Sequence, residues 1–560
     1  MSFNNYIALL SLLLVTVLTA SCGGSKNNSS EPPQDGFVVP AKPAIAVELL
    51  PKHAIVTWED VPDATYYQVY TNLESQQLQP YGEQIELKME LISLSIPLAA
   101  HLINWEDTQI LVEACSVAGC SQSETVSIND RSLEAIEVLT DDEAVGTGGQ
   151  FGYDVVISDD GSTIAVLQPR NEGSDLIIFE RQESGWNKQV INYLLEGSDD
   201  TILLNAVENS LSISADGSTI VVGVRMYVGV ERELMLTFAV YTREDSIWEN
   251  YTILAAQFLE TDTLGQFTAI SGDGNTIAAY GSEYDTQAGD SSFFEHIFTF
   301  TKTNDIWLLD EQLQTSNYDK GDEIGWMALD YNGSTLAVSA RFEDSNAVGI
   351  NGDQDNNESD SSGAVYVFEK TEAGWEQTTY IKSDNIEPGD RFGSSVDLSN
   401  DGTVIVATAT HEDGGSTQVN SGKDDNSNEN SGAIYVFRAT ESSWEQEAYI
   451  KPTRNIPNAN LGRRAKISGD GNFIVVGAIL EGAAGLGVND PAEYSDLPED
   501  GAAYIFEYNE GNWSQKARLR PLEYDMDSQF GWSVDINGNG DTAVVGSRFK
   551  NFADGAIYVY

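Results

Sequence analysis

A turn dipeptide, Asp-Gly or Asn-Gly, recurs at intervals of 56 to 69 residues and divides most of the chain into repeats. The dipeptides begin at Asp160, Asp216, Asp273, Asn332, Asp401, Asp470 and Asn539. A Trp follows each of the first six turns after 26 to 43 residues, whereas the next turn always follows that Trp after 25 to 30. Length therefore varies in one place, between the turn and the Trp.

Each repeat has the pattern of a four-stranded antiparallel sheet. An alternating strand precedes the turn, an apolar strand and a polar loop follow it, and a third strand such as residues 432–437 leads through the Trp into a fourth. Serial sheets of this kind bury their faces against one another and close into a ring. The sequence thus predicts an all-β chain with a seven-bladed β-propeller over residues 131–560. The last repeat lacks a fourth strand, which we expect residues 132–139 to supply.

The repeats resemble the FG-GAP repeats of integrin α-chain propellers and of bacterial proteins with such repeats in series. The resemblance rests on Phe151-Gly152, Phe392-Gly393 and Phe530-Gly531, on Leu-Gly or Ile-Gly at 264, 324 and 461, and on Val-Gly-Ala at 476–478. The integrin calcium loop, Asp-x-Asp-x-Asp-Gly-x-x-Asp, is mostly replaced by a Ser-x-Asp-Gly-x-Thr hairpin. The resemblance therefore implies the fold without implying calcium.

The first 21 residues have the pattern of an export signal. The apolar run of residues 7–18 is too short to span a bilayer as a helix. Its end resembles a bacterial lipobox, which makes Cys22 the expected lipidation site; the alternative is an ordinary signal peptide cleaved near Ala20. The residue after Cys22 is Gly23 and not Asp, which resembles the outer-membrane sorting pattern of Gram-negative lipoproteins. We expect an exported outer-membrane lipoprotein, attached only by lipid, with a flexible tether over 22–39.

Residues 40–129 show short alternating strands that predict a β-sandwich. They resemble a fibronectin type III domain in residues 56–58, in Ala64, Tyr67 and 69–70, and in the 119–123 ending. Cys115 and Cys120 flank a four-residue loop, where a cross-hairpin disulfide is geometrically plausible and an exported location favours it. The alternative is two free thiols.

The formal net charge of −59 disfavours nucleic acid and acidic lipids as partners. Two explanations of this charge are open. One is solubility or life in salty water, and the other is the binding of divalent cations. Calcium prefers six to eight oxygen ligands, and two stretches offer alternating oxygen side chains. The candidate ligands are Asp353, Asp355, Asn357 and Asp360 in the fourth repeat and Asp535, Asn537, Asn539 and Asp541 in the seventh. A plain hairpin turn explains the second stretch equally well.

Patterns of nucleophilic catalysis are absent from the sequence, so we expect no enzyme. His411-Glu412-Asp413 is expected at the surface, and the repeated Trp and Tyr residues are expected in the core. Trp326 and Trp532 are less fixed by the repeat and are candidates to face a ligand.

Three functions compete: a surface binding or adhesion module for a protein or glycan, an outer-membrane assembly scaffold, and a polysaccharide-active enzyme. The first is favoured because variable loops on a rigid scaffold commonly bind partners. The longest loops span residues 341–362, 410–431 and 480–500 of the fourth, fifth and sixth repeats. Because these repeats are consecutive, we expect their loops to lie side by side and to form one contiguous binding face.

Overall fold

The fold is taken from a computed structural model, which describes residues 38–73, 76–86, 91–141, 148–170, 173–182, 185–191, 195–196, 201–204, 210–228, 233–244, 247–254, 263–284, 293–482, 485–491 and 500–560. The predictions for residues 1–37, Cys22 among them, lie outside this part of the chain. A search of the described residues finds no helix with the length and apolarity that a membrane span requires.

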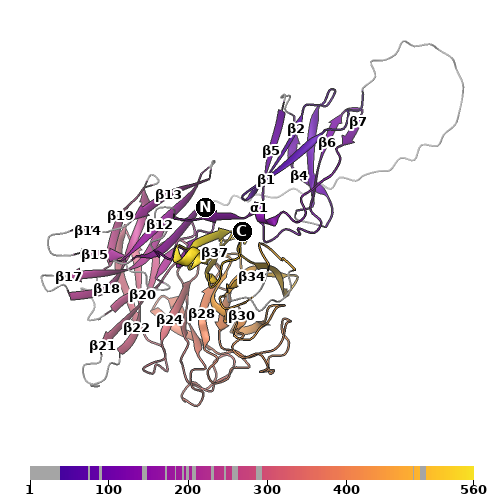
Figure 1. The fold of residues 1–560 in the computed structure, drawn as a ribbon. Helices are drawn as coiled ribbons and strands as arrows, with labels where there is room; N and C mark the ends of the chain where they lie inside the picture. The colour runs from indigo at the N-terminus through magenta and orange to yellow at the C-terminus, as the bar shows by residue number, and fades with distance from the viewer. Residues whose placement is uncertain are drawn as a thin grey trace, which may run out of the picture.

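Two sheets form the N-terminal unit (Figure 1). One sheet contains β1 (Ile45–Leu50), β2 (His53–Glu59) and β5 (Leu91–Pro97). The other contains β3 (Tyr66–Thr71), β4 (Gln79–Ile85), β6 (Gln109–Ser116), β7 (Gly119–Gln122) and β8 (Val126–Ser127). Trp58 of the first sheet and Tyr67 of the second are buried with their ring centroids 5.6 Å apart. Alternating apolar residues thus give each sheet one face for a shared core.

The repeats fold into antiparallel sheets whose strands follow chain order. The first contains β10 (Asp154–Ile157), β11 (Thr163–Arg170), β12 (Gly173–Gln182) and β13 (Gly185–Ile191). The second and third contain β16 (Leu211–Ile213), β17 (Thr219–Val228), β18 (Glu233–Glu244), β19 (Ile247–Leu254), β20 (Thr263–Ile270), β21 (Thr276–Tyr284), β22 (Phe293–Thr303) and β23 (Ile306–Leu313). A β14 (Leu195–Glu196) and β15 (Thr201–Leu204) hairpin is added to β17, and one β18–β20 pair merges these two sheets.

The later repeats are more regular. They contain β24 (Ile324–Leu329), β25 (Thr335–Ala340), β26 (Ala364–Thr371) and β27 (Gly374–Ile381); β28 (Phe392–Leu398), β29 (Val404–Ala409), β30 (Ala433–Ala439) and β31 (Trp444–Ile450); β32 (Leu461–Ile467), β33 (Phe473–Ala478), β34 (Ala502–Asn509) and β35 (Asn512–Leu519); and β36 (Phe530–Ile536), β37 (Ala543–Ser547) and β38 (Ala556–Val559), with helix α2 (Lys550–Ala553).

The sheets form a ring around their first strands. These strands contact one another in the order β10, β16, β20, β24, β28, β32, β36 and back to β10. At the turn-dipeptide end, backbone hydrogen bonds of 2.8–3.0 Å also run from sheet to sheet. They join Asp159 N to Ala215 O, Ala215 N to Gly272 O, Asp273 N to Tyr331 O, Tyr331 N to Asn400 O, Asn400 N to Gly469 O, Asp470 N to Gly538 O and Gly538 N to Asp159 O. This ring of four-stranded sheets is the architecture of a β-propeller.

An early segment completes the last sheet, as the sequence predicts. Strand β9 (Glu137–Leu139) pairs antiparallel with β38, and Val138 lies opposite Tyr558. The strand is shorter than the expected 132–139, because Ser132–Ala135 forms the short helix α1. Ala135 O in that helix accepts a hydrogen bond from Lys52 N at 2.9 Å. The first half of the segment therefore joins the two units instead of extending the sheet.

The sandwich packs on the turn-dipeptide side of the ring (Figure 1). One hydrophobic cluster includes Trp58 of the sandwich together with Tyr558 and Tyr560 of the ring. Lys52 Nζ donates a hydrogen bond to Tyr560 O at 2.5 Å, and His101 Nε2 donates one to Gly540 O at 2.8 Å. Burial lowers the pKa of Lys52 to about 8 and that of His101 to about 3. The opposite side of the ring carries the long loops.

Candidate functional site

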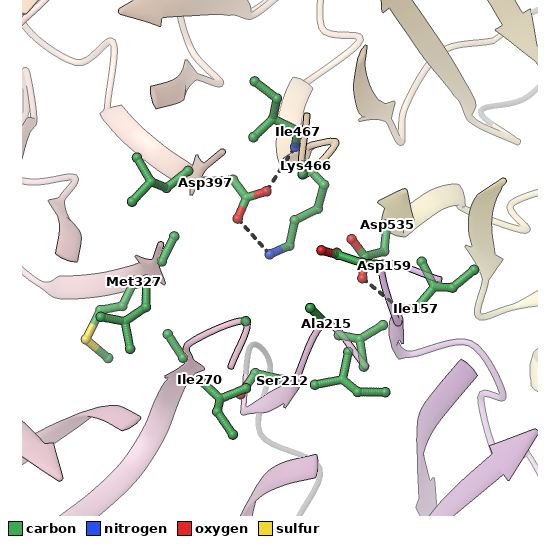
Figure 2. A pocket seen from close by; sticks show the side chains of 18 of the residues that line it. Ile157, Asp159, Ser212, Ala215, Ile270, Met327, Asp397, Lys466, Ile467 and Asp535 are labelled. Carbon is green, nitrogen blue, oxygen red and sulfur yellow. Dashed lines mark hydrogen bonds and ion pairs between the residues drawn. The ribbon is translucent and has the colours of Figure 1, made fainter. Parts of the chain in front are cut away.

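A polar channel runs along the axis of the ring, lined by the first strand of every sheet (Figure 2). Lys466 Nζ lies 3.0 Å from Asp397 Oδ1, whose other oxygen accepts a hydrogen bond from Ile467 N. Asp535 accepts one from Ile157 N at 2.8 Å, and burial raises the pKa of Asp535 to about 6. The channel has a cavity volume of only about 120 Å³.

A second hollow, of about 180 Å³, opens at the long-loop end of the channel. We call it the mouth, and four arginines line it: Arg341, Arg391, Arg463 and Arg464. Arg464 and Trp326 border both hollows and therefore separate them. Arg464 Nη1 is paired with buried Asp154. The mouth is consequently a shallow basin with a floor, and two of its four arginines are ion-paired, Arg464 with Asp154 and Arg341 with Glu323.

Aromatic rings hold the guanidinium groups of the mouth in place. The Cζ atom of Arg463 lies 3.5 Å from the ring centroid of Trp532, and that of Arg548, which is not one of the four, lies 3.0 Å from the same centroid. Arg341 and Arg391 both pack on Phe342, at 4.7 and 5.2 Å. Stacking of this kind fixes the planar cation while its N–H edge stays available for hydrogen bonds.

Burial and two arginines of the mouth act on the pKa of His411. His411 lines the mouth. Its pKa lies below the ordinary value because of burial and because Arg391 and Arg341 repel a second positive charge. Arg341 and His411 come from the loop that follows the second strand of a repeat. The other arginines come from the start of a first strand or from the residue before it. The mouth is therefore built by the repeat itself.

Buried ion pairs anchor the three long loops at their bases. Lys382 Nζ lies 2.7 Å from Glu343 Oε2 in the fourth repeat, and both side chains are almost completely buried. Lys451 and Glu412 form the same pair in the fifth repeat. In the sixth, Arg518 Nη2 lies 2.7 Å from Glu481 Oε1. Glu412 was expected at the surface as part of residues 411–413, but it is 2% exposed because it is the counterion of Lys451.

An asparagine fastens each long loop to the outer strand of its own sheet. Asn351, Asn420 and Asn489 are spaced by 69 residues and have positive φ angles of 52–55°. Asn351 N donates to Tyr380 O, and Tyr380 N donates back to Asn351 Oδ1, both at 2.8 Å. The other two asparagines make the same paired contacts with Tyr449 and Arg518. The loops are thus pre-organised, which lowers the entropic cost of binding.

The predicted calcium ligands do not all converge. Asp353 Oδ1 accepts a hydrogen bond from Asp355 N, whereas Asn357 Nδ2 donates to Asp319. Among the described His, Cys, Asp and Glu residues, the one grouping close enough to hold an ion contains Glu113 and two disulfide-bonded cysteines. Asp360 Oδ1 accepts a hydrogen bond from its neighbour Ser361. Calcium binding by residues 353–360 stays a prediction.

The second predicted set is divided between two places. Asn537, Asn539 and Asp541 are hydrogen-bonded to one another within the turn, while Asp535 lies in the channel. Asn537 uses its oxygen to accept a hydrogen bond from Thr542 N at 2.9 Å. These side chains therefore serve the hairpin, and calcium binding stays a prediction.

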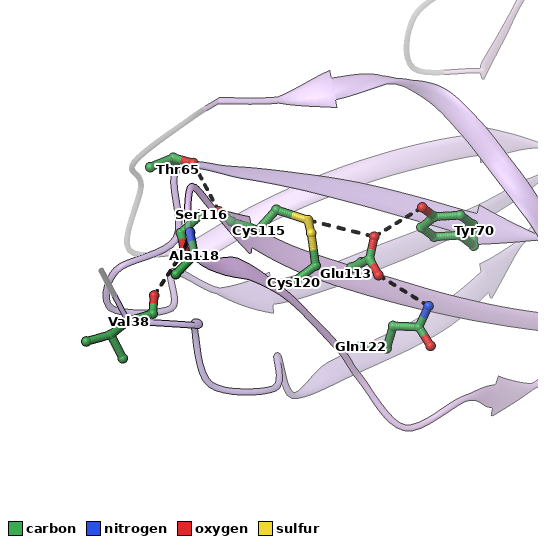
Figure 3. Close-up of a disulfide and its surroundings, with 9 residues drawn as sticks. All are labelled: Val38, Thr65, Tyr70, Glu113, Cys115, Ser116, Ala118, Cys120 and Gln122. Atoms are coloured by element: carbon green, nitrogen blue, oxygen red, sulfur yellow. Dashed lines mark hydrogen bonds between the residues drawn. A yellow bond between two sulfur atoms is a disulfide. The ribbon is translucent and has the colours of Figure 1, made fainter. Parts of the chain in front are cut away.

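Cys115 and Cys120 form a disulfide between β6 and β7 (Figure 3). Glu113 lies beside it and contacts Tyr70 and Gln122. The bridge ties two neighbouring strands of one sheet of the sandwich, where Cys115 lies opposite Cys120.

Sequence reasoning anticipated the aromatic residues of the mouth and missed its arginines. Trp326 and Trp532 do line it, as candidates to face a ligand. The signal for the arginines lay beside the repeat motif, in Arg391 before Phe392 and in Arg463-Arg464 after Gly462. In a chain with 29 basic and 88 acidic residues, arginines at these repeat positions are a marked local excess.

The comparison with family models identifies the repeats. The model described as "FG-GAP repeat" matches residues 375–437 and 513–560. These two segments match the FG-GAP repeat. The two matched segments include strands of the fourth, fifth, sixth and seventh repeats, in which the loop and strand lengths are most regular. None of the curated proteins matches the chain.

Several solved structures are distantly similar to the chain. The β-propeller domain of Cps50 (Swd1) from Myceliophteria thermophila is 10% identical, with 76% of this chain and 99% of that chain covered and a TM-score of 0.40. An oligogalacturonate lyase from Vibrio parahaemolyticus is 11% identical, with 76% and 96% covered and a TM-score of 0.42. A periplasmic gluconolactonase from Pseudomonas aeruginosa is 11% identical, with 82% and 98% covered and a TM-score of 0.37. Their activities are not carried over to this chain.

Proposed function

We propose that this chain is a cell-envelope binding module that holds a protein or glycan partner on its long-loop face. In this account an export signal and a lipidated Cys22 attach it to the outer membrane. A fibronectin type III-like sandwich and a seven-bladed FG-GAP propeller follow. The observation that carries the proposal is the pre-organisation of three consecutive long loops by buried ion pairs and asparagine clamps.

The position of the sandwich supports the choice of face. It packs against the turns near Asp160 and Asp541, so part of the turn side is already covered. The long-loop side has no such cover among the described residues. Loops of variable length on a rigid ring are the usual place for partner recognition.

The channel favours binding over catalysis. An enzyme that threads a polymer through the ring would need an open passage for its substrate. Here the passage is about 120 Å³ and the Arg464–Asp154 pair lies across its long-loop end. We therefore propose that the chain is not an enzyme. An outer-membrane assembly scaffold remains the second candidate, because rigid loops also suit membrane-protein partners.

Replacement of the loops tests this proposal. Residues 341–362, 410–431 and 480–500 would each be replaced by the short loop of residues 548–554. Lys382, Lys451 and Arg518 would be changed to Met in the same variant, so that no buried cation loses its counterion. The tether-free chain would then be used to capture partners from intact cells. We expect the variant to keep its far-ultraviolet spectrum and to lose the partner that the parent captures. Capture that survives the loop replacement would refute the proposed face. The nature of the captured molecule separates an adhesion partner from an assembly partner.

Calcium is tested separately, by the melting temperature in calcium chloride and in chelator. If the 353–360 loop binds calcium, the melting temperature should be higher in calcium chloride than in chelator, and Asp353→Asn with Asp355→Asn should abolish this difference.

A further inference from the structure

We propose that the arginine-lined mouth binds carboxylate groups of an acidic peptide segment. This inference deepens the proposed function, on which it rests for the identity of the binding face. It concerns the centre of the long-loop face, at the axis of the ring, and is independent of which loop contacts the rest of the partner.

Two arginines of the mouth, Arg391 and Arg464, have unused hydrogen-bonding capacity, whereas Arg341 is paired with Glu323. Among the residues that the structure describes, Arg391 has no carboxylate partner, although it lies in a chain with three times as many acidic as basic residues. Arg464 is 4% exposed, and its Nε atom has no hydrogen-bond partner in the described part of the chain. A buried N–H without a partner is costly, and a ligand oxygen would satisfy it.

The chemistry of the guanidinium group selects the ligand. Its parallel N–H groups match the two oxygens of a carboxylate, and charge-assisted bonds of this type are the strong ones. The net charge of −59 opposes an acidic ligand only at long range, because at physiological salt the screening length is about 8 Å. Inside the mouth the nearby arginines determine the potential.

The aromatic residues argue for a peptide carboxylate instead of an acidic sugar. Sugar sites generally offer an open aromatic face on which the apolar side of a pyranose ring can stack. Both Arg463 and Arg548 pack on Trp532, which is 9% exposed, and Arg464 packs on Trp326. The rings are therefore occupied in positioning cations. The cavity of about 180 Å³ suits one or two acidic side chains.

The test uses hexaglutamate, hexaglutamine and a hexamer of galacturonate as probes of the whole exported chain, with heats of binding measured at 20 mM and 150 mM salt. We expect hexaglutamate to bind, more weakly at the higher salt, and hexaglutamine not to bind. Arg391→Gln with Arg464→Gln should weaken hexaglutamate binding about tenfold per arginine. Arg243→Gln with Arg438→Gln removes two guanidiniums that are paired with Glu180 and Glu447 outside the mouth, and should change nothing.

The proposal is overturned by the absence of hexaglutamate binding, by equal effects of the two double variants, or by tighter binding of the galacturonate hexamer than of the peptide. Because Arg464 is paired with buried Asp154, the single variant Arg391→Gln is measured as well, and it must weaken binding while leaving the melting temperature unchanged. The loops stay intact in these variants. Partner capture without hexaglutamate binding would reject the inference alone, and hexaglutamate binding by a chain that captures nothing would reject the proposed function alone.

Discussion

Lys382 Nζ lies 2.7 Å from Glu343 Oε2 in an environment that excludes water from both side chains. The ammonium also donates hydrogen bonds to Ser345 O and Ser362 Oγ, both at 2.5 Å. Burial lowers the pKa of Lys382, while Glu343 opposes that shift. The pair holds both ends of the 341–362 loop and recurs in the next repeat as Lys451–Glu412. In the sixth repeat Glu481 is paired with Arg518 instead, so a buried counterion for this glutamate is a structural requirement of the long-loop face.

We expect Glu343→Gln to lower the free energy of unfolding by about 3–5 kcal/mol, because it leaves a buried ammonium without its counterion. The measurement is denaturant unfolding at pH 7. The matched control is Glu343→Leu combined with Lys382→Met, which removes both charges and should cost much less. A double variant as unstable as the single one would mean that packing, and not charge pairing, holds the loop.

Gly363 tests how closely neighbouring sheets approach. Its φ angle is +83°, and an added Cβ would lie 2.0 Å from Phe392 O in the next sheet. Gly389 has a φ angle of +90° and nothing within 4 Å of an added Cβ. Gly389→Ala should cost only the backbone strain, about 1–2 kcal/mol. Gly363→Ala should lower the melting temperature considerably further; equal effects would show that the contact with Phe392 is unimportant.

The buried His101 predicts a loss of stability in acid. Its folded pKa of about 3 lies below the unfolded value of 6.5, so only the unfolded chain gains a proton between these values. Stability is therefore full above pH 6.5 and falls by about 1.4 kcal/mol per pH unit below it. His101→Gln cannot titrate, so its stability should fall about 2 kcal/mol less than that of the parent between pH 7 and pH 5. Parallel pH curves would contradict the assignment.

Asp322 and Asp390 act in the opposite direction over the same range. Burial raises the pKa of each to about 7, so the folded chain retains protons that the unfolded chain loses as the pH rises from about 4 to 7. Their stabilising contribution is present in acid and is lost toward neutral pH. The change in the free energy of unfolding caused by Asp390→Asn should therefore be more favourable at pH 8 than at pH 5. A variant that is equally destabilised at both pH values would contradict the raised pKa.

Strand β9 is tested without the sandwich, by comparing a chain that begins at residue 131 with one that begins at residue 141. Only the longer chain contains Glu137–Leu139, the partner of β38. We expect the shorter chain to melt many degrees lower and to associate through the open edge of its last sheet. Equal melting temperatures would show that this pairing does not stabilise the ring.

The sequence was sufficient for features set by local chemistry. Turn dipeptides, alternating strands and the regular Trp predict the repeats, and Trp375, Trp444 and Trp513 are buried as expected. The pairing of β9 with β38 also followed from a missing strand. The ion pair of Glu412 with Lys451 could not be predicted from the sequence, because its partners are 39 residues apart and meet only when a loop folds back. The arginines of the mouth are likewise brought together by ring geometry, which no single repeat reveals.

The central claim is that a partner contacts the long-loop face, and site-specific photo-crosslinking tests it most directly. A photoreactive residue would replace Asp355 at a long-loop tip in one variant and Asp305, in the exposed turn between β22 and β23 on the other side, in a second. The account predicts an adduct with the captured partner from position 355 and none from position 305. An adduct from position 305 alone would contradict it.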